Sequence, residues 1–294
     1  MIGAFALGFA VAIIALYAVV ITVVAIVSLR PPRIHQFLSP GMMGFPQESF
    51  SVKTSDGVAI HGWHVPAGGE TVVIACHGYL VNRCEWVPTC SFLIPEGASM
   101  VFFDHRGQGR SGSAKVTMGR DESADVLAVL DWVAEAYAGK KIVLMGSSMG
   151  AVAAVLAAVE RPGEVAGLIL DAPYRNLDEA AREWWSFLGG QQLKFWMQPI
   201  RWFGPLLLGF RPSSIDLEAR LKDIQHIPTL LLFGTEDPIV KRDSAEALLK
   251  GAGNHSEIVW FEGATHGAGR LNDPKKFQDA TLRFLVKFGL LPAD

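Results

Sequence analysis

The chain has 294 residues, half of them hydrophobic, which is enough for one large domain with a full apolar core. Its formal net charge at pH 7 is only −3 and it contains no block of lysines or arginines, so we expect no nucleic-acid partner and favour a small-molecule substrate. The cysteines cannot form a complete set of disulfides and lack metal-binding spacing, so we expect ordinary thiols and no metal site at Cys76, Cys84 and Cys90.

The first segment of the chain is uncharged from Ile2 to Leu29, which exceeds the roughly 20 apolar residues that cross a bilayer core. We therefore expect a transmembrane anchor over residues 1–29. A cleaved signal peptide would need a positively charged start, an apolar core of about 7–15 residues and a small-residue cleavage site. A buried core helix is a further alternative. Because Arg30 and Arg33 follow this segment and no Lys or Arg precedes it, the positive-inside rule predicts a single-pass protein with its remainder in the cytoplasm.

A proline-rich stretch, residues 30–46, follows the apolar segment and cannot continue its helix. We interpret it as a linker that tethers the apolar segment to one domain, residues 47–294. In this interpretation the anchor is only a tether, so removing residues 1 to about 33 would leave a soluble and reactive domain.

Short apolar runs alternate with helical segments along this domain. The clearest helices are predicted at Asp121–Ala136 and Ala151–Arg161, and such alternation predicts an α/β fold with helices on both faces of a mostly parallel sheet. About eight strands are predicted, at residues 48–54, 58–65, 70–78, 99–107, 141–146, 165–173, 228–234 and 256–263.

A glycine-rich segment after the fourth predicted strand matches the spacing of a dinucleotide-binding motif. Gly107, Gly109 and Gly112 give G-x-G-x-x-G. That motif requires a helix to begin at the glycines, whereas the next helix is predicted only near Asp121. The mismatch favours a glycine-rich loop, and we expect no nicotinamide or other cofactor.

The stretch KIVLMGSSMGAVAAVLAA places two serines between a buried strand and an alanine-rich helix. Gly146 and Gly150 flank Ser148 symmetrically, in the Gly-x-Ser-x-Gly pattern that holds a nucleophilic serine above the edge of a sheet. Ser147 is expected only to fill the turn. The pattern alone fits an ordinary tight turn equally well, so other parts of a catalytic site are needed.

A serine nucleophile requires a histidine base and a carboxylate that orients the histidine. His266 lies just after the last predicted strand in a loop of glycines and alanines, which leaves its ring free to point into a site. Glu236 and Asp237 follow the preceding predicted strand. We favour Asp237 as the carboxylate, with Glu236 facing solvent, although an aspartate in a plain turn would give the same local sequence.

An oxyanion hole needs two backbone N–H groups directed at the developing charge. Gly78 follows an apolar strand and would let the loop bend so that the N–H of Tyr79 points at the substrate. The N–H of Met149, the residue after the serine, would be the second donor. His77 would brace this loop, or would simply be a polar residue at a strand end.

A long segment from Tyr174 to Ile227 separates two predicted strands. Such insertions are usually lids or binding elements, and this one is apolar and contains half of the tryptophans of the chain. We expect Trp184, Trp202 and Leu207 to contact substrate. The alternative is that its apolar side chains only pack the lid on the sheet.

The segments HGYLVNR, FFDHRGQGRSG, GSSMG, GTEDPIV and GATHG resemble, in order and spacing, the motifs of the α/β-hydrolase superfamily. The resemblance covers about Gln47 to Leu291 and is greatest to membrane-anchored serine hydrolases related to lysophospholipases, monoacylglycerol lipases and acyl-peptide or proline-type peptidases. It implies that Asp104 and Arg106 belong to a structural loop beside the site. Serine at the turn excludes the dehalogenase and epoxide-hydrolase branches, and no HGGG-type loop supports the hormone-sensitive-lipase-like branch.

The leading hypothesis is a membrane-tethered serine hydrolase that cleaves a carboxylic ester, such as a lipid ester or a thioester, through a Ser148-His266-Asp237 triad and an acyl-enzyme. A serine aminopeptidase is the alternative enzyme, and it would need a subsite for an amine. A non-catalytic hydrolase-fold protein that binds a ligand or partner at the membrane is the alternative outside enzymes. Nothing in the sequence indicates the oligomeric state.

Overall fold

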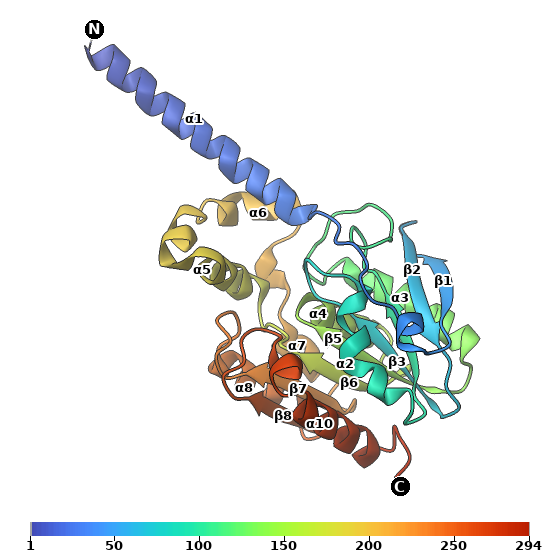
Figure 1. Ribbon diagram of the computed structural model, residues 1–294. Coiled ribbons are helices and arrows are strands. Elements are labelled where there is room, and N and C mark those ends of the chain that lie inside the picture. The colour runs from blue at the N-terminus through green and yellow to red at the C-terminus, as the bar shows by residue number, and fades with distance from the viewer. Residues whose placement is uncertain (1, 294) are drawn as a thin grey trace.

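The computed structural model describes residues 2–293, and its most prominent feature is a single helix that projects from an α/β domain (Figure 1). This helix, α1 (Ile2–Leu29), has its N-terminal end far from the domain and its C-terminal end against it. The stretch Ala4–Leu29 has a mean hydropathy of 3.0 and is mostly exposed, so it is long and apolar enough to cross a membrane. A signal sequence near an N-terminus can meet the same criteria of length and hydropathy.

The domain is built on one eight-stranded sheet in the order β1-β2-β4-β3-β5-β6-β7-β8. The pairs β1·β2 and β2·β4 are antiparallel and the other pairs are parallel, which confirms the predicted fold class. The strands are β1 (Glu48–Lys53), β2 (Ala59–Val65), β3 (Thr71–Cys76), β4 (Ser99–Phe103), β5 (Lys141–Ser147), β6 (Val165–Asp171), β7 (Thr229–Gly234) and β8 (Ser256–Phe261).

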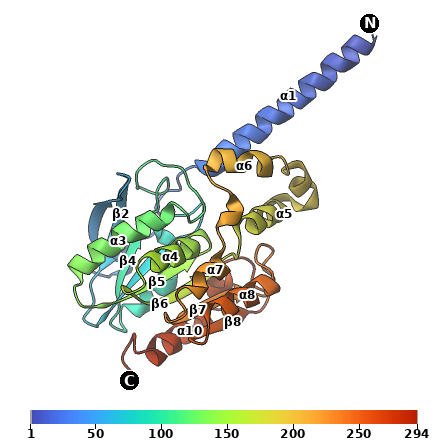
Figure 2. The ribbon, with the colours of Figure 1, turned by 180° about the vertical axis from the view of Figure 1, so that it is seen from behind.

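Helices cover both faces of this sheet, which explains why its central strands are apolar at nearly every position. Along β3, Ile74 points to one face and Val73 to the other, and each joins a separate apolar core. The first face, seen in Figure 2, is covered by α3 (Glu122–Ala136), α4 (Met149–Glu160), α7 (Leu217–Lys222) and α8 (Arg242–Ala252). The second is covered by α2 (Val87–Cys90), α9 (Gly269–Asn272) and α10 (Pro274–Lys287).

The segment between β6 and β7 forms a helical lid at the end of the domain nearest α1 (Figure 1). It contains α5 (Leu177–Trp196), which is kinked at Gly189 and Gly190, and α6 (Ile200–Leu208), which packs against α1. The last part of the predicted insertion, helix α7, packs instead against α4 and α8 and so belongs to the layer that covers the sheet.

The chain between α1 and β1 is fixed to the domain rather than free. The Arg33 guanidinium donates hydrogen bonds to the carbonyls of Gly109 (2.9 Å) and Ser111 (2.6 Å) in the glycine-rich loop. Asn82 donates to the carbonyl of Ile34 at 3.0 Å. These contacts set the position of α1 relative to the sheet, a role that the interpretation of residues 30–46 as a linker did not include.

Candidate active site

The turn between β5 and α4 holds Ser148 in a conformation that is rare for a residue with a side chain, with φ 48° and ψ −110°. Its backbone N–H donates to the carbonyl of Asp171 at 2.8 Å, which ties the turn to the end of β6. The flanking glycines are required by space: a Cβ would lie 2.6 Å from the Ala151 Cα at Gly146, and 2.2 Å from the Cys76 carbonyl oxygen at Gly150. The Ser148 hydroxyl therefore projects from the sheet edge.

Three side chains predicted from separate parts of the sequence meet at this point. The Nε2 atom of His266 lies 2.9 Å from the Ser148 Oγ, and its Nδ1 atom lies 2.8 Å from the Asp237 Oδ2. The other oxygen of Asp237 accepts the backbone N–H groups of Ile239 (2.8 Å) and Val240 (2.9 Å), so the carboxylate is held in place. The side chain of Asp237 is 1% exposed and that of His266 is 13% exposed, so only the histidine is reachable from outside.

The neighbouring candidates occupy other surroundings. Glu236, next to Asp237, is exposed to solvent. Ser147, next to Ser148, is buried and does not line the cavity above the serine. The arrangement therefore distinguishes one serine and one carboxylate from their sequence neighbours.

Two backbone N–H groups beside Ser148 are without a hydrogen-bond acceptor in the described part of the chain, those of Tyr79 and Met149. Met149 is the first residue of α4, where an N–H has no partner within the helix. Both residues line the same cavity as Ser148. This is the arrangement that an oxyanion hole requires.

The loop that carries Tyr79 is braced by His77, as the sequence suggested. The ring Nδ1 of His77 donates to the Gly78 carbonyl at 2.7 Å, and its Nε2 accepts the backbone N–H of His105 at 2.9 Å. One tautomer of the neutral ring satisfies both bonds. Burial lowers the pKa of His77 to about 4, so the ring stays neutral at physiological pH.

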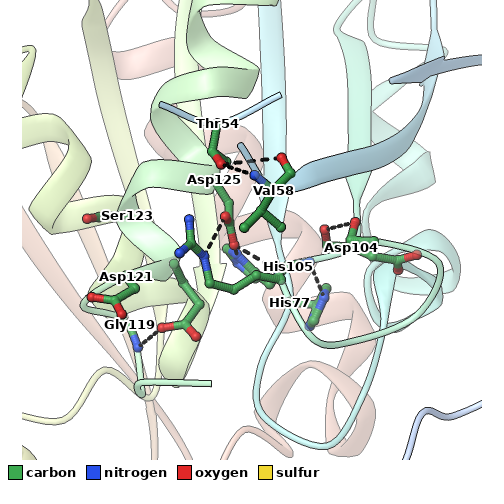
Figure 3. Close-up of polar contacts among 12 residues, drawn as sticks. Thr54, Val58, His77, Asp104, His105, Gly119, Asp121, Ser123 and Asp125 are labelled. Carbon is green, nitrogen blue, oxygen red and sulfur yellow. Dashed lines mark hydrogen bonds and ion pairs between the residues drawn. The ribbon is translucent and has the colours of Figure 1, made fainter. Parts of the chain in front are cut away.

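A further buried polar group stabilises the loop after β4 (Figure 3). Asp125 accepts both the backbone N–H and the Nε of Arg106, each at 2.8 Å, and Arg106 also pairs with Asp56. Asp104 accepts the backbone N–H groups of Arg83 (2.9 Å) and Arg110 (2.8 Å). Asp104 and Arg106 therefore shape a loop beside the site.

Sequence reasoning missed a buried cluster of charges behind the site. Arg270 pairs with Asp171 through Nη1 and with Glu85 through Nη2, the latter at 2.5 Å. The second oxygen of Glu85 accepts the backbone N–H of Gly78 at 2.7 Å. Because the backbone carbonyl of Asp171 also accepts the N–H of Ser148, the cluster is connected to the serine turn, the Tyr79 loop and the loop of His266. The one sequence signal for this cluster was Asp171, a charged residue at the end of the otherwise apolar strand β6.

An apolar cavity of about 170 Å³ lies above Ser148 and His266. Of the proposed lid contacts, Trp184 and Leu207 line it. Trp202 does not, and its side chain is 78% exposed, which corrects the expectation from sequence. The physical reason is helical periodicity, because α6 turns the face with Leu207 toward the cavity and places Trp202 on the opposite side.

The described residues contain no group of three or more His, Cys, Asp and Glu side chains placed to hold a metal ion. All three cysteines are free and buried, and burial raises the pKa of the Cys76 and Cys90 thiols well above the usual value. They therefore behave as parts of the core.

The chain is similar to known hydrolases in sequence and in structure. The family model described as serine aminopeptidase S33 matches residues 69–205. The uncharacterised protein Rv2307c of Mycobacterium tuberculosis is 29% identical over 245 residues, which cover 82% of this chain and 79% of that protein. Human monoglyceride lipase is 38% identical over 113 residues, covering 38% of this chain and 37% of the lipase.

Among solved structures, the Pyrococcus furiosus esterase Pf2001 superimposes with a TM-score of 0.74 at 26% identity, covering 88% of this chain and 98% of the esterase. The chain belongs to the α/β-hydrolase superfamily. The comparisons support a hydrolase whose fold is similar to that of an esterase. The match to the family model includes the Tyr79 loop and the Ser148 turn, whereas Asp237 and His266 lie beyond its last matched residue, 205.

Proposed function

We propose that the protein is a serine esterase in which Ser148, His266 and Asp237 form the catalytic triad. The observation that supports this most directly is the continuous chain of hydrogen bonds from the Ser148 hydroxyl through His266 to the buried Asp237, at the base of an apolar cavity. A serine hydroxyl becomes a nucleophile when a base within hydrogen-bond distance removes its proton, and these distances meet that requirement.

The reaction follows from these positions. The Ser148 oxygen bonds to the acyl carbon while its proton passes to the Nε2 of His266, and the N–H groups of Tyr79 and Met149 stabilise the negative oxygen. The C–O bond to the alcohol breaks, and the alcohol takes the proton from His266. Water then attacks the acyl-enzyme, again giving a proton to His266, and the acid leaves as Ser148 regains its proton. The residues require no cofactor for these steps.

We propose that α1 anchors the enzyme as a single-pass membrane protein, with its hydrolase domain, residues 47–294, at the cytoplasmic surface and a lipid ester as substrate. The apolar cavity, the length of α1 and the position of Arg30 directly after it support this placement. A reporter fused after Asp294 should then be inaccessible to protease added outside intact cells. Cleavage of the reporter would contradict the orientation.

Fluorophosphonate labelling and ester hydrolysis of the full chain in detergent test the catalytic proposal. The wild type and Ser148→Ala are compared, with Ser147→Ala as the matched control. We expect Ser148→Ala to lose both signals and Ser147→Ala to keep substantial activity, because the hydroxyl that lies within hydrogen-bond distance of His266 belongs to Ser148. Full turnover by Ser148→Ala would refute the assignment.

A serine aminopeptidase is the second candidate, because the matching family model carries that description. Its amine subsite would need a carboxylate in the cavity. Asp178 lines the cavity, and its Oδ2 lies 3.9 Å from the Nη2 of Arg182. An aminoacyl-naphthylamide in the same assay distinguishes the two activities. Faster Ser148-dependent cleavage of this amide than of esters would favour the peptidase.

A further inference from the structure

The last turns of α1 form part of the wall of the catalytic cavity. Ala25, Ser28 and Leu29 line the same cavity as Ser148 and His266. Ala25 is only 5% exposed, although most of the helix around it is open. An anchor that served only as a tether would have no such contact.

Hydrogen bonds hold this end of α1 to the site itself. The Tyr79 hydroxyl donates to the carbonyl of Ser28 at 2.8 Å, and Tyr79 also carries one of the free N–H groups beside Ser148. The backbone N–H of Val116 donates to the carbonyl of Leu29 at 2.8 Å. The helix end is therefore fixed relative to the reacting atoms.

The lid follows α1 for several turns away from the domain. Tyr17 donates a hydrogen bond to the Trp196 carbonyl, and the two rings lie 5.9 Å apart, edge to face. From Tyr17 to Leu29 a helix rises about 18 Å at 1.5 Å per residue. If α1 crosses a bilayer with a hydrocarbon core of about 30 Å, the lid lies within that core over much of this length.

The outer surface of the lid has the composition that such a position requires. Large apolar side chains are exposed there, namely Phe187, Leu188, Phe195, Trp196, Trp202, Phe203 and Leu206. The opposite side of α6 presents Ile200, Gly204 and Leu207 to the cavity. One helix thus separates the cavity from the surface on which lipid would lie.

We propose that the last two turns of α1 and the inner side of α6 form the binding groove for the acyl chain of a membrane lipid ester, which reaches Ser148 laterally from the bilayer. The occupant is an acyl chain because both walls are apolar and continue the surface of a helix that is itself suited to hydrocarbon. This proposal rests on the esterase function and makes α1 a substrate-binding element that discriminates by chain length.

The test uses the full chain in phosphatidylcholine nanodiscs with p-nitrophenyl acetate, butyrate and octanoate. Ala25→Trp places a large ring in the groove, and Ile26→Trp is the matched control at the same depth, because Ile26 is 48% exposed. We expect wild-type kcat/KM to rise several-fold from acetate to octanoate. Ala25→Trp should lower the octanoate value about tenfold and change the acetate value by less than about threefold, while Ile26→Trp keeps the wild-type profile.

A second variant fills the groove from the lid. A Cβ at Gly204 meets no atom within 4 Å, so Gly204→Leu fits without displacing backbone, and Trp202→Leu changes the outer side of the same helix as its control. Gly204→Leu should lower kcat/KM for octanoate relative to acetate. This result can be obtained even if Ala25→Trp fails to fold and loses fluorophosphonate labelling. An unchanged profile in Gly204→Leu and in every labelled Ala25→Trp sample would overturn the groove. Absence of Ser148-dependent ester hydrolysis in the wild type would instead overturn the esterase function.

Discussion

Replacement of Arg270 by methionine removes the positive charge that lies between Glu85 and Asp171. The side chains involved are nearly inaccessible, at 5% for Arg270, 4% for Asp171 and 13% for Glu85. Methionine fills similar volume, so the main change is two buried carboxylates left without their cation. Removing one partner of a buried ion pair typically costs about 3–5 kcal/mol.

A loss of that size should be easy to measure. A domain of this length loses roughly 2–4 °C in Tm per kcal/mol, so Arg270→Met should unfold about 6–20 °C below the wild type. The full chain in detergent is followed by near-ultraviolet circular dichroism at one heating rate. The Tm of Arg270→Lys should lie between those of the wild type and Arg270→Met, because an ammonium group cannot form the paired contacts of the guanidinium with both carboxylates.

Neutralising the partners provides the control. In the triple variant with Glu85→Gln and Asp171→Asn added to Arg270→Met, no charge is left uncompensated, so part of the lost stability should return. A Tm for Arg270→Met within about 2 °C of the wild type would refute the reasoning, because the cluster would then contribute little to the fold.

Three further predictions concern the triad, the turn and pH. Asp237→Asn should lower kcat for ester hydrolysis by about 10⁴-fold, because the correct tautomer of His266 is lost, whereas Glu236→Gln should leave kcat unchanged. Equal kcat values for the two variants in steady-state assays would contradict this prediction. Gly150→Ala should sharply reduce folded yield and activity, because its Cβ would collide with the Cys76 carbonyl, so a normal Tm and kcat would count against the turn geometry. Since the folded pKa of His77, about 4, lies below its unfolded value, its contribution to stability is complete above pH 6.5 and is lost as the pH falls toward 4, at up to about 1.4 kcal/mol per pH unit. The free energy of unfolding, measured with urea between pH 4 and 7.5, should therefore rise less steeply with pH for His77→Gln than for the wild type. An equal pH dependence in the two proteins would show that His77 does not cause it.

The strands and the serine turn could be predicted from the sequence because their causes are local. An apolar run of five or six residues must be a buried strand in this context, and only glycine fits at the positions two residues before and two residues after Ser148. Asp237 and His266 were found for a related reason, since polar residues directly after parallel strands gather at one edge of the sheet. Their roles in catalysis stay predictions.

The cluster around Arg270 could not be predicted because its partners are far apart in the chain, and a lone arginine after a strand has no local pattern that names them. The docked side of α1 was hidden for a different reason. Nearly every position of that helix is apolar, so hydropathy could not show that Ile21 and Ala25 face protein while their neighbours are open. Similarly, α6 has apolar residues on all sides, and this gave no sign that Leu207 would face the cavity and Trp202 would not.

The attachment of Arg33 to the glycine-rich loop has a kinetic consequence once α1 lies in a bilayer. Because the chain directly after α1 is fixed to the domain, Ser148 stays at a constant distance from the membrane and cannot move through the solution to meet substrate. Encounters then depend on lateral diffusion of lipid in two dimensions. The rate should follow the mole fraction of ester in the membrane, so adding inert lipid at constant total ester should slow the enzyme by surface dilution.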